Sequence, residues 1–393
     1  MKTDNLQNGL PEPRKLRVAV FGLRGFPCVE GGVERHCESL YRRMGAWAEV
    51  TVYRRRPYVG RGKDREWNGI RFVDLPSTRI KGVEAFWHSW QAARHIAKWT
   101  PDVVHIHNIG PGFVAGWLRR KGIPVVLTYH SANYEHEKWG WAARKWLHHS
   151  ERIALENASR VIFVNRFRME RYPDWVRKKS TFIPNGIECP LPTEGRAELE
   201  RLGVEAGRYV LAVGRITPEK GFDTLIRGFL ESGEAEKGWK LVIAGGVESE
   251  KRYGAALRRM AAEGDAGNSV VFAGQVLGGQ LEELYANAAL FVLSSKHEGF
   301  PLVLLEAMSR GLDVLASDIP ATHLVPLSGG DYFPQGNAAA LAEQLRKRLD
   351  GERRQRSYDL ALFNWDAIAA ATAGVYREAV RNAGSAEVRQ KGK

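Results

Sequence analysis

Cysteine is scarce in this chain of 393 residues, and long apolar runs are missing. Its three cysteines, Cys28, Cys37 and Cys189, are odd in number and lack metal-ligand spacing, which argues against a disulfide framework or a zinc cluster. No apolar run approaches the ~18–20 residues that span a bilayer. The first residues also lack the apolar core of a signal peptide. We therefore expect reduced thiols and a cytoplasmic protein.

Acidic residues are scarce in the first half of the chain. Residues 1–180 hold 33 Lys and Arg against 17 Asp and Glu, a net charge of +16, whereas the rest of the chain carries −3. Ten of the 12 tryptophans also lie in residues 1–180. This basic, Trp-rich half suits an anionic membrane surface. Nucleic acid would attract the same charge, and ordinary solubility charge around buried tryptophans is a third interpretation.

Apolar runs typical of buried strands alternate with helical patterns, which predicts parallel sheets. The length suffices for two domains with their own cores. We expect an α/β chain with a disordered lead over 1–15, Rossmann-like domains over 16–187 and 208–364, a linker over 188–207, a helix over 365–380 and a disordered tail over 381–393. Strands are predicted over 16–22, 50–53, 70–75, 102–106, 125–128, 161–164, 209–213, 240–244, 270–273 and 289–293, and helices over 83–99, within 133–156, and over 280–288 and 302–310.

Two carboxylates flank a predicted helix start in the stretch from Ser294 to Pro320. Glu298 lies on the turn after a buried strand, and Glu306 lies in the second turn of the following helix, whose first position suits Pro301. Unpaired N–H groups at a helix start can hold an anion. Carboxylates on either side of a bound phosphate could bind the hydroxyls of a sugar nucleotide. Alternatively, both acids are simply solvated.

Arg215 and Lys220 flank a turn between the strand at 209–213 and a helix that begins near Asp223. A cationic pair on such a turn can neutralise a diphosphate. The alternative interpretation is surface charge.

A glycine-containing loop, Gly22 to Gly32, follows the first predicted strand, as on the phosphate side of doubly wound domains. Its spacing is not G-x-G-x-x-G, and the second strand ends in three arginines rather than an acid, so a bound NAD ribose is not supported. His130 follows the strand at 125–128, where open α/β sheets bind ligands. His105 is expected to be structural, and no role is assigned to His107.

The chain from about Leu16 to about Val380 resembles a retaining GT-B glycosyltransferase of family 4, and its N-terminal half resembles the rhamnosyltransferase-like subgroup. Ser131 stands where that subgroup more often has Gly, and Ser294-Ser295 where Pro-Ser is usual. The resemblance is carried by GLRGFPCVEGGVERHCESL (22–40), VHIHNIGPG (104–112), TYHSANYEHEKWG (128–140), IPNG (183–186), GRITPEKGF (214–222) and EGFPLVLLEAM (298–308).

This resemblance implies two Rossmann-like domains that face each other across a cleft, a C-terminal helix that crosses back to the N-terminal domain, and a nucleotide-sugar donor bound without a required metal. It implies catalytic roles for Glu298, His130, Lys220 and Arg215. The implied donor contacts are Arg215 and Lys220 on the diphosphate, Glu306 on the ribose, Glu298 with Gly299, Phe300, Pro301 and Leu302 on the sugar and its phosphate, His130 on the sugar, and Gly31 and Gly32 beside the phosphates and the acceptor.

The resulting hypothesis is a retaining enzyme that transfers a hexose or deoxyhexose, with rhamnose as the hypothesised sugar. The hypothesised acceptor is a bacterial surface polysaccharide growing on a polyprenyl diphosphate lipid, at the inner face of the plasma membrane. No nucleic-acid partner and no cofactor are expected. Two alternatives stay open: a sugar-nucleotide epimerase of the same architecture, and a non-catalytic basic scaffold that binds membrane or nucleic acid.

Overall fold

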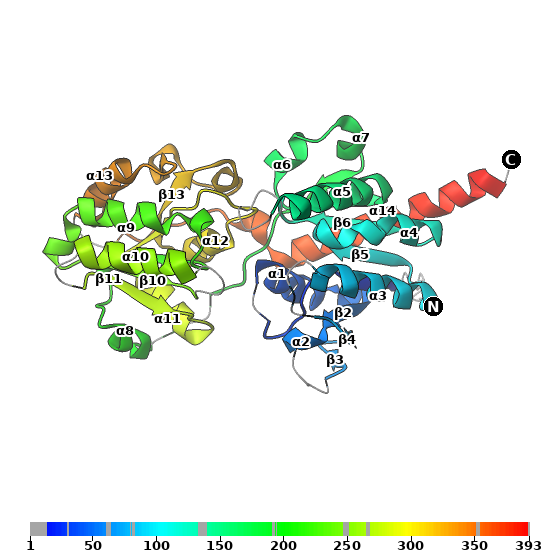
Figure 1. Cartoon of the computed structure of the whole chain (residues 1–393), viewed down its shortest axis with the longest axis horizontal. Helices are drawn as coiled ribbons and strands as arrows, with labels where there is room; N and C mark the ends of the chain where they lie inside the picture. Colours follow the sequence, from blue (N-terminus) through cyan, green and yellow to red (C-terminus); the bar gives the residue numbers. More distant parts are fainter. Residues whose placement is uncertain are drawn as a thin grey trace, which may run out of the picture. The chain divides into compact units, whose positions relative to one another are not determined.

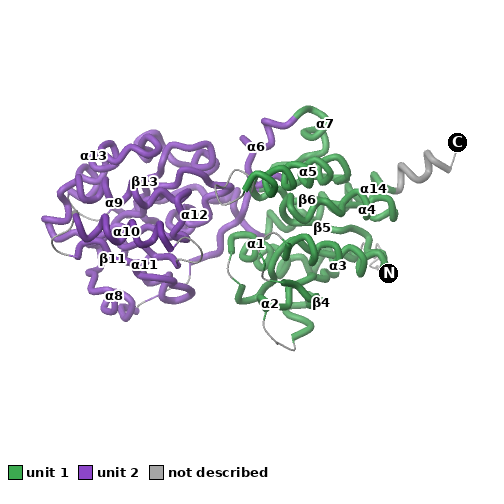
Figure 2. The backbone as a smooth tube through the Cα atoms, in the orientation of Figure 1, with its two compact units in different colours: residues 1–162, 173–183, 366–393 green, residues 163–172, 184–365 purple. Residues whose placement is uncertain are grey.

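The computed structural model describes residues 14–391 except 30, 60–63, 79, 81–82, 133–139, 191–192, 194, 247–250, 265–267 and 351–353. The chain forms two compact units (Figure 2). Unit 1 comprises Met1–Ile162, Pro173–Ile183 and Asp366–Lys393, and unit 2 comprises Phe163–Tyr172 and Pro184–Trp365. The expected disorder of residues 1–13 lies outside the described residues.

The first sheet has eight strands in the order β3-β4-β2-β1-β5-β6-β7-β8 (Figure 1). The strands β4, β2, β1, β5 and β6 run parallel, as predicted, and β3 pairs antiparallel with β4. Their near-continuous burial reflects helices on both faces of the sheet. The strands are β1 (Leu16–Phe21), β2 (Ala48–Arg55), β3 (Glu66–Trp67), β4 (Ile70–Leu75), β5 (Val103–His107), β6 (Val125–Tyr129), β7 (Arg160–Phe163) and β8 (Ser180–Phe182).

Among the helices of unit 1, α14 (Trp365–Lys391) comes from the far end of the chain. Its Tyr376 hydroxyl lies 2.7 Å from Nδ1 of His105 in β5, which confirms that the C-terminal helix returns to the N-terminal unit. The helix continues past its predicted end at Val380, so the expected tail is helical as far as Lys391. The others are α1 (Gly32–Tyr41), η1 (Met44–Ala46), α2 (Arg56–Val59), α3 (Val83–Trp99), η2 (Gly110–Val114), α4 (Ala115–Arg120), α5 (Trp141–Asn157) and α7 (Asp174–Arg177).

The second sheet has six parallel strands in the order β11-β10-β9-β12-β13-β14. They are β9 (Tyr209–Val213), β10 (Lys240–Ala244), β11 (Val270–Gly274), β12 (Leu290–Leu293), β13 (Asp313–Asp318) and β14 (Tyr332–Pro334). The unit also holds α6 (Arg166–Glu170), α8 (Ala197–Leu202), η4 (Pro218–Lys220), α9 (Phe222–Glu231), η5 (Glu234–Lys237), α10 (Lys251–Gly264), α11 (Gly279–Asn287), α12 (Leu302–Ser309), η6 (Pro320–Leu324), η7 (Gly329–Asp331), α13 (Ala338–Leu349) and η8 (Ala361–Phe363).

The helix α8 lies inside the segment that the sequence analysis treats as a linker. Its first backbone N–H groups, those of Glu198 and Leu199, donate to Oε1 of Glu283 in α11 at 2.7 and 2.9 Å. A carboxylate at a helix N-terminus satisfies orphan donors and complements the helix dipole. This part of the segment is therefore packed on unit 2.

The helix α9 is anchored by apolar residues at helical spacing. Phe222, Leu225, Ile226 and Phe229 are all buried and pack in one core cluster with residues of β9, β10 and α13. Because the helix is held along this face, its N-terminal turn is held against the end of β9.

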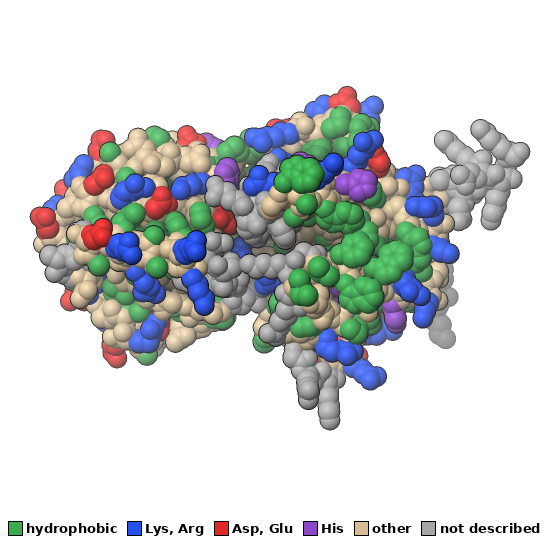
Figure 3. All heavy atoms as spheres, in the orientation of Figure 1, with side chains coloured by type: hydrophobic (Ala, Val, Ile, Leu, Met, Phe, Trp, Pro, Cys, Tyr) green, Lys and Arg blue, Asp and Glu red, His purple; other side chains and the backbone are tan. Residues whose placement is uncertain are grey.

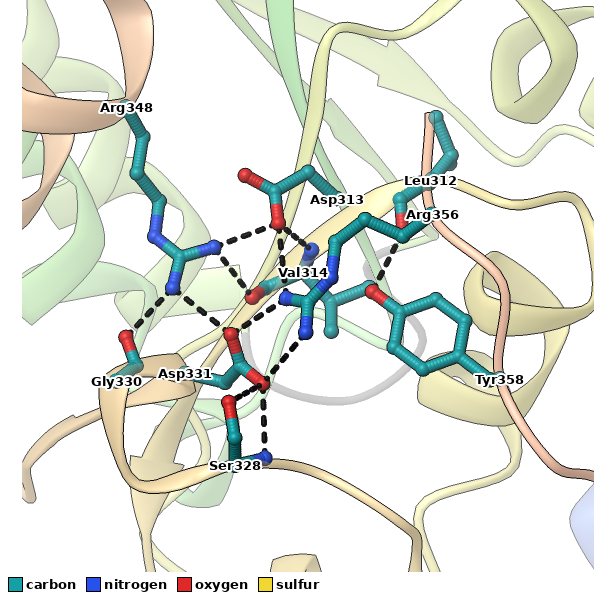
Figure 4. A network of polar contacts seen from close by, with 9 residues as sticks. All are labelled: Leu312, Asp313, Val314, Ser328, Gly330, Asp331, Arg348, Arg356 and Tyr358. Carbon is teal, nitrogen blue, oxygen red and sulfur yellow. Dashed lines mark hydrogen bonds and ion pairs between the residues drawn. The ribbon is translucent and has the colours of Figure 1, made fainter. Parts of the chain in front are cut away.

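A buried charge network ties α13 to β13 and η7 (Figure 4). Arg348 bonds Asp313 at 2.6 Å and Asp331 at 2.9 Å, and Arg356 also contacts both carboxylates. The backbone N–H and hydroxyl of Ser328 donate to Asp331 as well. Burial alone would raise the pKa of Asp331, but the hydrogen bonds from Arg356, Arg348 and Ser328 outweigh it and hold that pKa well below its usual range.

In the described part of the chain, no helix is long and apolar enough to cross a membrane. All three cysteines are described, and all are free thiols, with Cys37 buried.

We predict that Asp331→Asn lowers the free energy of unfolding of unit 2 by ~3–5 kcal/mol at neutral pH, because it removes one of the two carboxylates that Arg348 and Arg356 share and leaves Asp313 as their single counter-charge. The pKa of Asp331 is depressed on folding, so its contribution is present above the unfolded Asp pKa of ~3.9 and declines as the pH falls further. Urea unfolding at several pH values measures both effects. Glu343→Gln, which breaks an exposed pair with Lys347, is the control and should change little. An equal effect of the two variants would contradict the role of the network.

Candidate active site

The central strand β9 of the second sheet pairs with β10 on one side and β12 on the other. The connections from β9 and β12 therefore diverge at the carboxyl edge, and open α/β sheets bind ligands at such a point. Arg215 and Lys220 follow β9, and Glu298 follows β12. The three charged residues predicted from separate motifs thus belong to neighbouring connections of one sheet edge.

Glycine brings these two connections together. Gly221 has a φ of 63°, and a Cβ atom there would lie 2.1 Å from the Ser294 carbonyl oxygen. The Ser294 hydroxyl donates to the Lys220 carbonyl at 3.0 Å, and the Lys296 N–H donates to the Glu219 carbonyl at 2.7 Å. No side chain fits at Gly221 without displacing the segment that leads to Glu298.

Lys220 and Glu298 form an ion pair. The Lys220 Nζ lies 2.6 Å from the Glu298 Oε1, and the two side chains are 17% and 10% exposed. The Ser295 hydroxyl donates to the same Glu298 oxygen at 2.7 Å, and the Ser295 carbonyl accepts a hydrogen bond from Ser317 at 2.6 Å. Each member of the pair is thereby held in position by its partner and by the surrounding turn.

Arg215 is exposed, and its side chain has no partner among the described residues. The N–H groups of Gly299 and Phe300, immediately before α12, likewise have no acceptor in the described part of the chain. Pro301 was predicted at the first helical position; instead it is the N-cap, with φ −84° and ψ 70°, and the helix begins at Leu302. The donors therefore come from the turn that precedes the helix.

Glu306 lies on α12 and is half-buried. Its Oε2 accepts a hydrogen bond from the buried Tyr285 hydroxyl at 2.9 Å. The exposed-face interpretation of Glu306 is therefore wrong. Tyr285 stands on α11, and no motif in the sequence pointed to it.

The glycine-containing loop of unit 1 packs against a buried glutamate. Gly31 has a φ of 141°, and a Cβ atom there would lie 2.0 Å from Oε2 of Glu34. The other carboxylate oxygen accepts a hydrogen bond from the Arg24 N–H at 2.9 Å. Burial raises the pKa of Glu34, partly offset by these hydrogen bonds and by Arg24 and Arg55. Gly31 and Gly32 thus stand at the start of α1 on a loop shaped by Glu34.

His130 belongs to a buried hydrogen-bonded chain. Its Nε2 lies 2.9 Å from Nδ1 of His107, whose Nε2 lies 2.6 Å from the Tyr41 hydroxyl. That hydroxyl is 2.8 Å from Nδ1 of His105, because alternate residues of β5 point to the same face. Burial, reinforced by neighbouring imidazoles, lowers the pKa of His107 and of His130 well below the usual value. Both rings are neutral at neutral pH.

The sequence analysis singled out His130 but missed its neighbours. His36, Tyr41 and Tyr376 come from α1 and α14, and ring contacts join His36 to both His107 and His130. The one available signal was the glycine-containing loop, which places the start of α1 at the carboxyl edge of β1. Nothing local marks Tyr376, which is 271 residues from His105.

A pocket of about 490 Å³ in unit 2 lies between α6 and η6. It is lined by Arg166, Phe167, Asp318, Ile319, Pro320 and His323, and by none of the predicted site residues. We therefore base the site on the charged residues at the carboxyl edges and not on this pocket.

Two family models match the chain. Residues 30–190 match glycosyltransferase family 4, and residues 198–360 match the glycosyl transferases group 1 model. The chain is 29% identical over 356 residues to a GDP-mannose-dependent alpha-mannosyltransferase of Mycobacterium tuberculosis, covering 82% of this chain and 84% of that protein. It is 26% identical over 271 residues to an alpha-monoglucosyldiacylglycerol synthase of Streptococcus pneumoniae, covering 65% and 60%.

Solved structures share the fold. Sucrose-phosphate synthase from Thermosynechococcus elongatus superposes with a TM-score of 0.72 at 22% identity, covering 93% of this chain and 99% of that one. Anabaena HepE in complex with UDP-glucose gives a TM-score of 0.68 at 17% identity, covering 94% and 100%. The fold is thus GT-B, as predicted. The chain belongs to the family 4 glycosyltransferases and is a retaining hexosyltransferase-type enzyme.

We predict that Gly221→Ala destabilises unit 2 by more than its left-handed φ alone requires. Gly233→Ala is the matched control, because its φ is 72° and nothing lies within 4 Å of the added Cβ. The control should lose ~1–2 kcal/mol, and Gly221→Ala a further ~1–3 kcal/mol from the clash with the Ser294 carbonyl. Urea unfolding compares the two variants. Equal losses would show that the contact between the two connections is not needed.

Proposed function

We propose that this glycosyltransferase takes its sugar from a nucleotide-sugar donor whose diphosphate is held by Arg215 and Lys220. The main support for this proposal is the arrangement of charged side chains and backbone N–H groups at the carboxyl edge of the second sheet. Three features follow adjacent parallel strands: an exposed arginine with no partner among the described residues, the Lys220–Glu298 pair, and the N–H groups of Gly299 and Phe300. Cations and helix-start donors recognise a diphosphate.

The family resemblance assigns the remaining donor contacts. It assigns Glu298 and the backbone from Gly299 to Leu302 to the donor sugar and its phosphate, and Glu306, which Tyr285 orients, to the ribose hydroxyls. It also assigns His130 to the sugar, and Gly31 and Gly32 to the phosphates and the acceptor. The structural neighbour HepE, crystallised with UDP-glucose, supports a donor of this class.

The chemistry follows from where negative charge develops. As the C1–oxygen bond to the phosphate breaks, the leaving diphosphate gains charge, and Arg215, Lys220 and the helix start stabilise it. The acceptor hydroxyl attacks C1 from the face that the diphosphate leaves, so the anomeric configuration is retained. The acceptor proton passes to the departing diphosphate oxygen. The products are the glycosylated acceptor and a nucleoside diphosphate.

The transferred sugar is a hexose or deoxyhexose. Rhamnose is proposed on the subgroup resemblance of residues 22–40, 104–112, 128–140 and 183–186. The names of the curated relatives specify mannose and glucose, so a donor panel must include their nucleotide forms.

We predict that one nucleoside diphosphate raises the melting temperature of the wild-type protein and that Lys220→Ala abolishes the shift. A ligand at 100 times its Kd adds ~2.7 kcal/mol of stability. Lys220→Ala should also raise the activation free energy of transfer by ~2–4 kcal/mol, which lowers the transfer rate about 30- to 1,000-fold. Lys347→Ala, an exposed lysine on α13, is the control.

A thermal-shift panel with UDP, GDP, ADP and dTDP checks the binding, and product analysis checks the chemistry. Unaltered turnover in folded Lys220→Ala and Glu298→Ala variants would refute the site. Donor converted to its epimer without an acceptor would establish the epimerase alternative. Salt-sensitive RNA binding without any diphosphate shift would favour the scaffold.

Unit 1 carries an exposed aromatic surface, which we define as Phe86, Trp87, Phe113, Trp141 and Trp146. Phe86 stacks on Phe113 with ring centroids 4.6 Å apart, and Trp146 contacts both rings at 5.7 Å. Trp87 is 49% exposed and Trp141 is 78% exposed. Figure 3 shows hydrophobic side chains gathered over the region where Figure 1 labels α3, α4 and α5.

Cations accompany this surface. Lys145 lies over the Trp141 ring at 5.4 Å, and Arg144 beside it is exposed. The first half of α5, residues 141–149, contains no acid. We propose that this aromatic surface rests on an anionic membrane at the inner face of the plasma membrane, where the enzyme meets a polyprenyl-diphosphate-linked glycan acceptor. Tryptophan favours the interface, and each nearby cation contributes ~1 kcal/mol.

We predict that the protein binds vesicles containing phosphatidylglycerol, and that Trp87→Ser or Lys145→Ala weakens this binding. Losing one cation should weaken it about five-fold, and added salt should weaken it further. Co-sedimentation with vesicles measures the binding, and Lys347→Ala serves as the matched control. Vesicle binding that is equal in Trp87→Ser and wild type would remove the aromatic surface from the proposal.

A further inference from the structure

Three histidines from separate elements meet at the carboxyl edge of the first sheet. His107 ends β5, His130 follows β6, and His36 stands on α1. If one nitrogen is taken from each ring, the three atoms lie within 4.8 Å of one another. The residues are 4%, 0% and 8% exposed for His36, His107 and His130. Such a buried cluster of imidazoles is not explained by donor binding, which uses His130 alone.

The spacing fits a tetrahedral metal ion. Nitrogen ligands lie ~2.0–2.1 Å from Zn²⁺, so two of them are about 3.4 Å apart in a tetrahedral site. His107 Nδ1 and His130 Nε2 are 2.9 Å apart, and His36 completes a triangle within the 4.8 Å limit. Small ring rotations reach the required distances. A fourth coordination position is left for water.

The surroundings of His107 match those of a ligating histidine. A metal-bound histidine usually donates its other ring N–H to an oxygen, which fixes the tautomer. His107 Nε2 is 2.6 Å from the Tyr41 hydroxyl, and if it donates there, its Nδ1 carries the free electron pair toward the cluster. Tyr41 can then donate to His105, whose other nitrogen is 2.6 Å from the Thr128 hydroxyl.

The chemistry of the three ligand atoms indicates which metal ions would bind. Histidine coordinates a metal ion through a ring nitrogen of its neutral imidazole. Imidazole suits zinc, copper, nickel and cobalt, whereas magnesium, calcium and manganese prefer oxygen ligands. Among the described residues, the cluster consists of three imidazole nitrogens.

We propose that His36, His107 and His130 form a binding site for one divalent transition-metal ion, such as Zn²⁺. The ion would regulate the enzyme rather than serve as its cofactor. If His130 contacts the donor sugar, as the proposed function holds, coordination withdraws its Nε2 from the sugar. Metal binding then inhibits transfer reversibly.

The direct test is a titration of the chelator-treated full chain with CoCl₂, which needs no substrate. We expect saturable visible absorption bands of tetrahedral cobalt at one ion per chain, and their loss on adding ZnCl₂. His36→Ala should weaken binding at least ten-fold. Tyr41→Phe keeps the buried ring, so it serves where a histidine variant fails to fold, and should weaken binding about 10- to 100-fold. His323→Ala, a surface histidine paired with Asp318, should bind as wild type does.

Absence of saturable cobalt bands in the folded wild type, or unchanged affinity in His36→Ala, would overturn the site. The effect on transfer is measured separately. Zn²⁺ should inhibit wild-type transfer, a chelator should restore it, and His36→Ala should resist inhibition. Cobalt binding without inhibition would uphold the site and overturn its regulatory effect. A wild-type protein without transferase activity would refute the proposed function and leave the cobalt result intact.

Discussion

In each unit, the first strand along the chain lies in the middle of the sheet, and this arrangement determines where the candidate site residues lie. In unit 1, β1 pairs with β2 and β5; in unit 2, β9 pairs with β10 and β12. The connections that leave β1 and β5 in unit 1, and β9 and β12 in unit 2, then run toward opposite sides of the sheet. The glycine-containing loop follows β1, and the cationic turn follows β9, so both are located at that point of their sheets.

Within unit 2 the charges of this edge are only partly balanced. Lys220 is neutralised by Glu298 at 2.6 Å, whereas Arg215 has no partner among the described residues. Under the proposed function, a diphosphate meets one uncompensated cation and one that shares its charge with a carboxylate. Because the Lys220–Glu298 pair is mostly enclosed, its interaction is stronger than that between solvated ions.

The two ends of unit 2 use charge differently. At the edge, charge is left accessible for a ligand. In the Arg348–Asp313–Asp331–Arg356 network, all charged groups are satisfied internally, and the function is to hold α13 against β13 and η7. In unit 1, the polar groups between α1, β5 and β6 include imidazoles and a phenol joined by hydrogen bonds. Neutral rings tolerate burial when they are hydrogen-bonded, and they keep electron pairs available.

The sequence by itself determined the alternation of strands and helices and both parallel sheets, because hydrophobic periodicity and glycine-bearing turns are local signals. It also determined the family, through the resemblance of motifs such as GRITPEKGF (214–222) and EGFPLVLLEAM (298–308). It also located Arg215, Lys220, Glu298 and Glu306 on strand-to-helix turns or the helix that follows. Only the tertiary structure decided that Lys220 pairs with Glu298 and that Glu306 is held by Tyr285. It alone joined His36, Tyr41 and Tyr376 to the histidines of β5 and β6. Those contacts connect residues far apart in the chain, and they depend on strand order and helix packing, which no local pattern encodes.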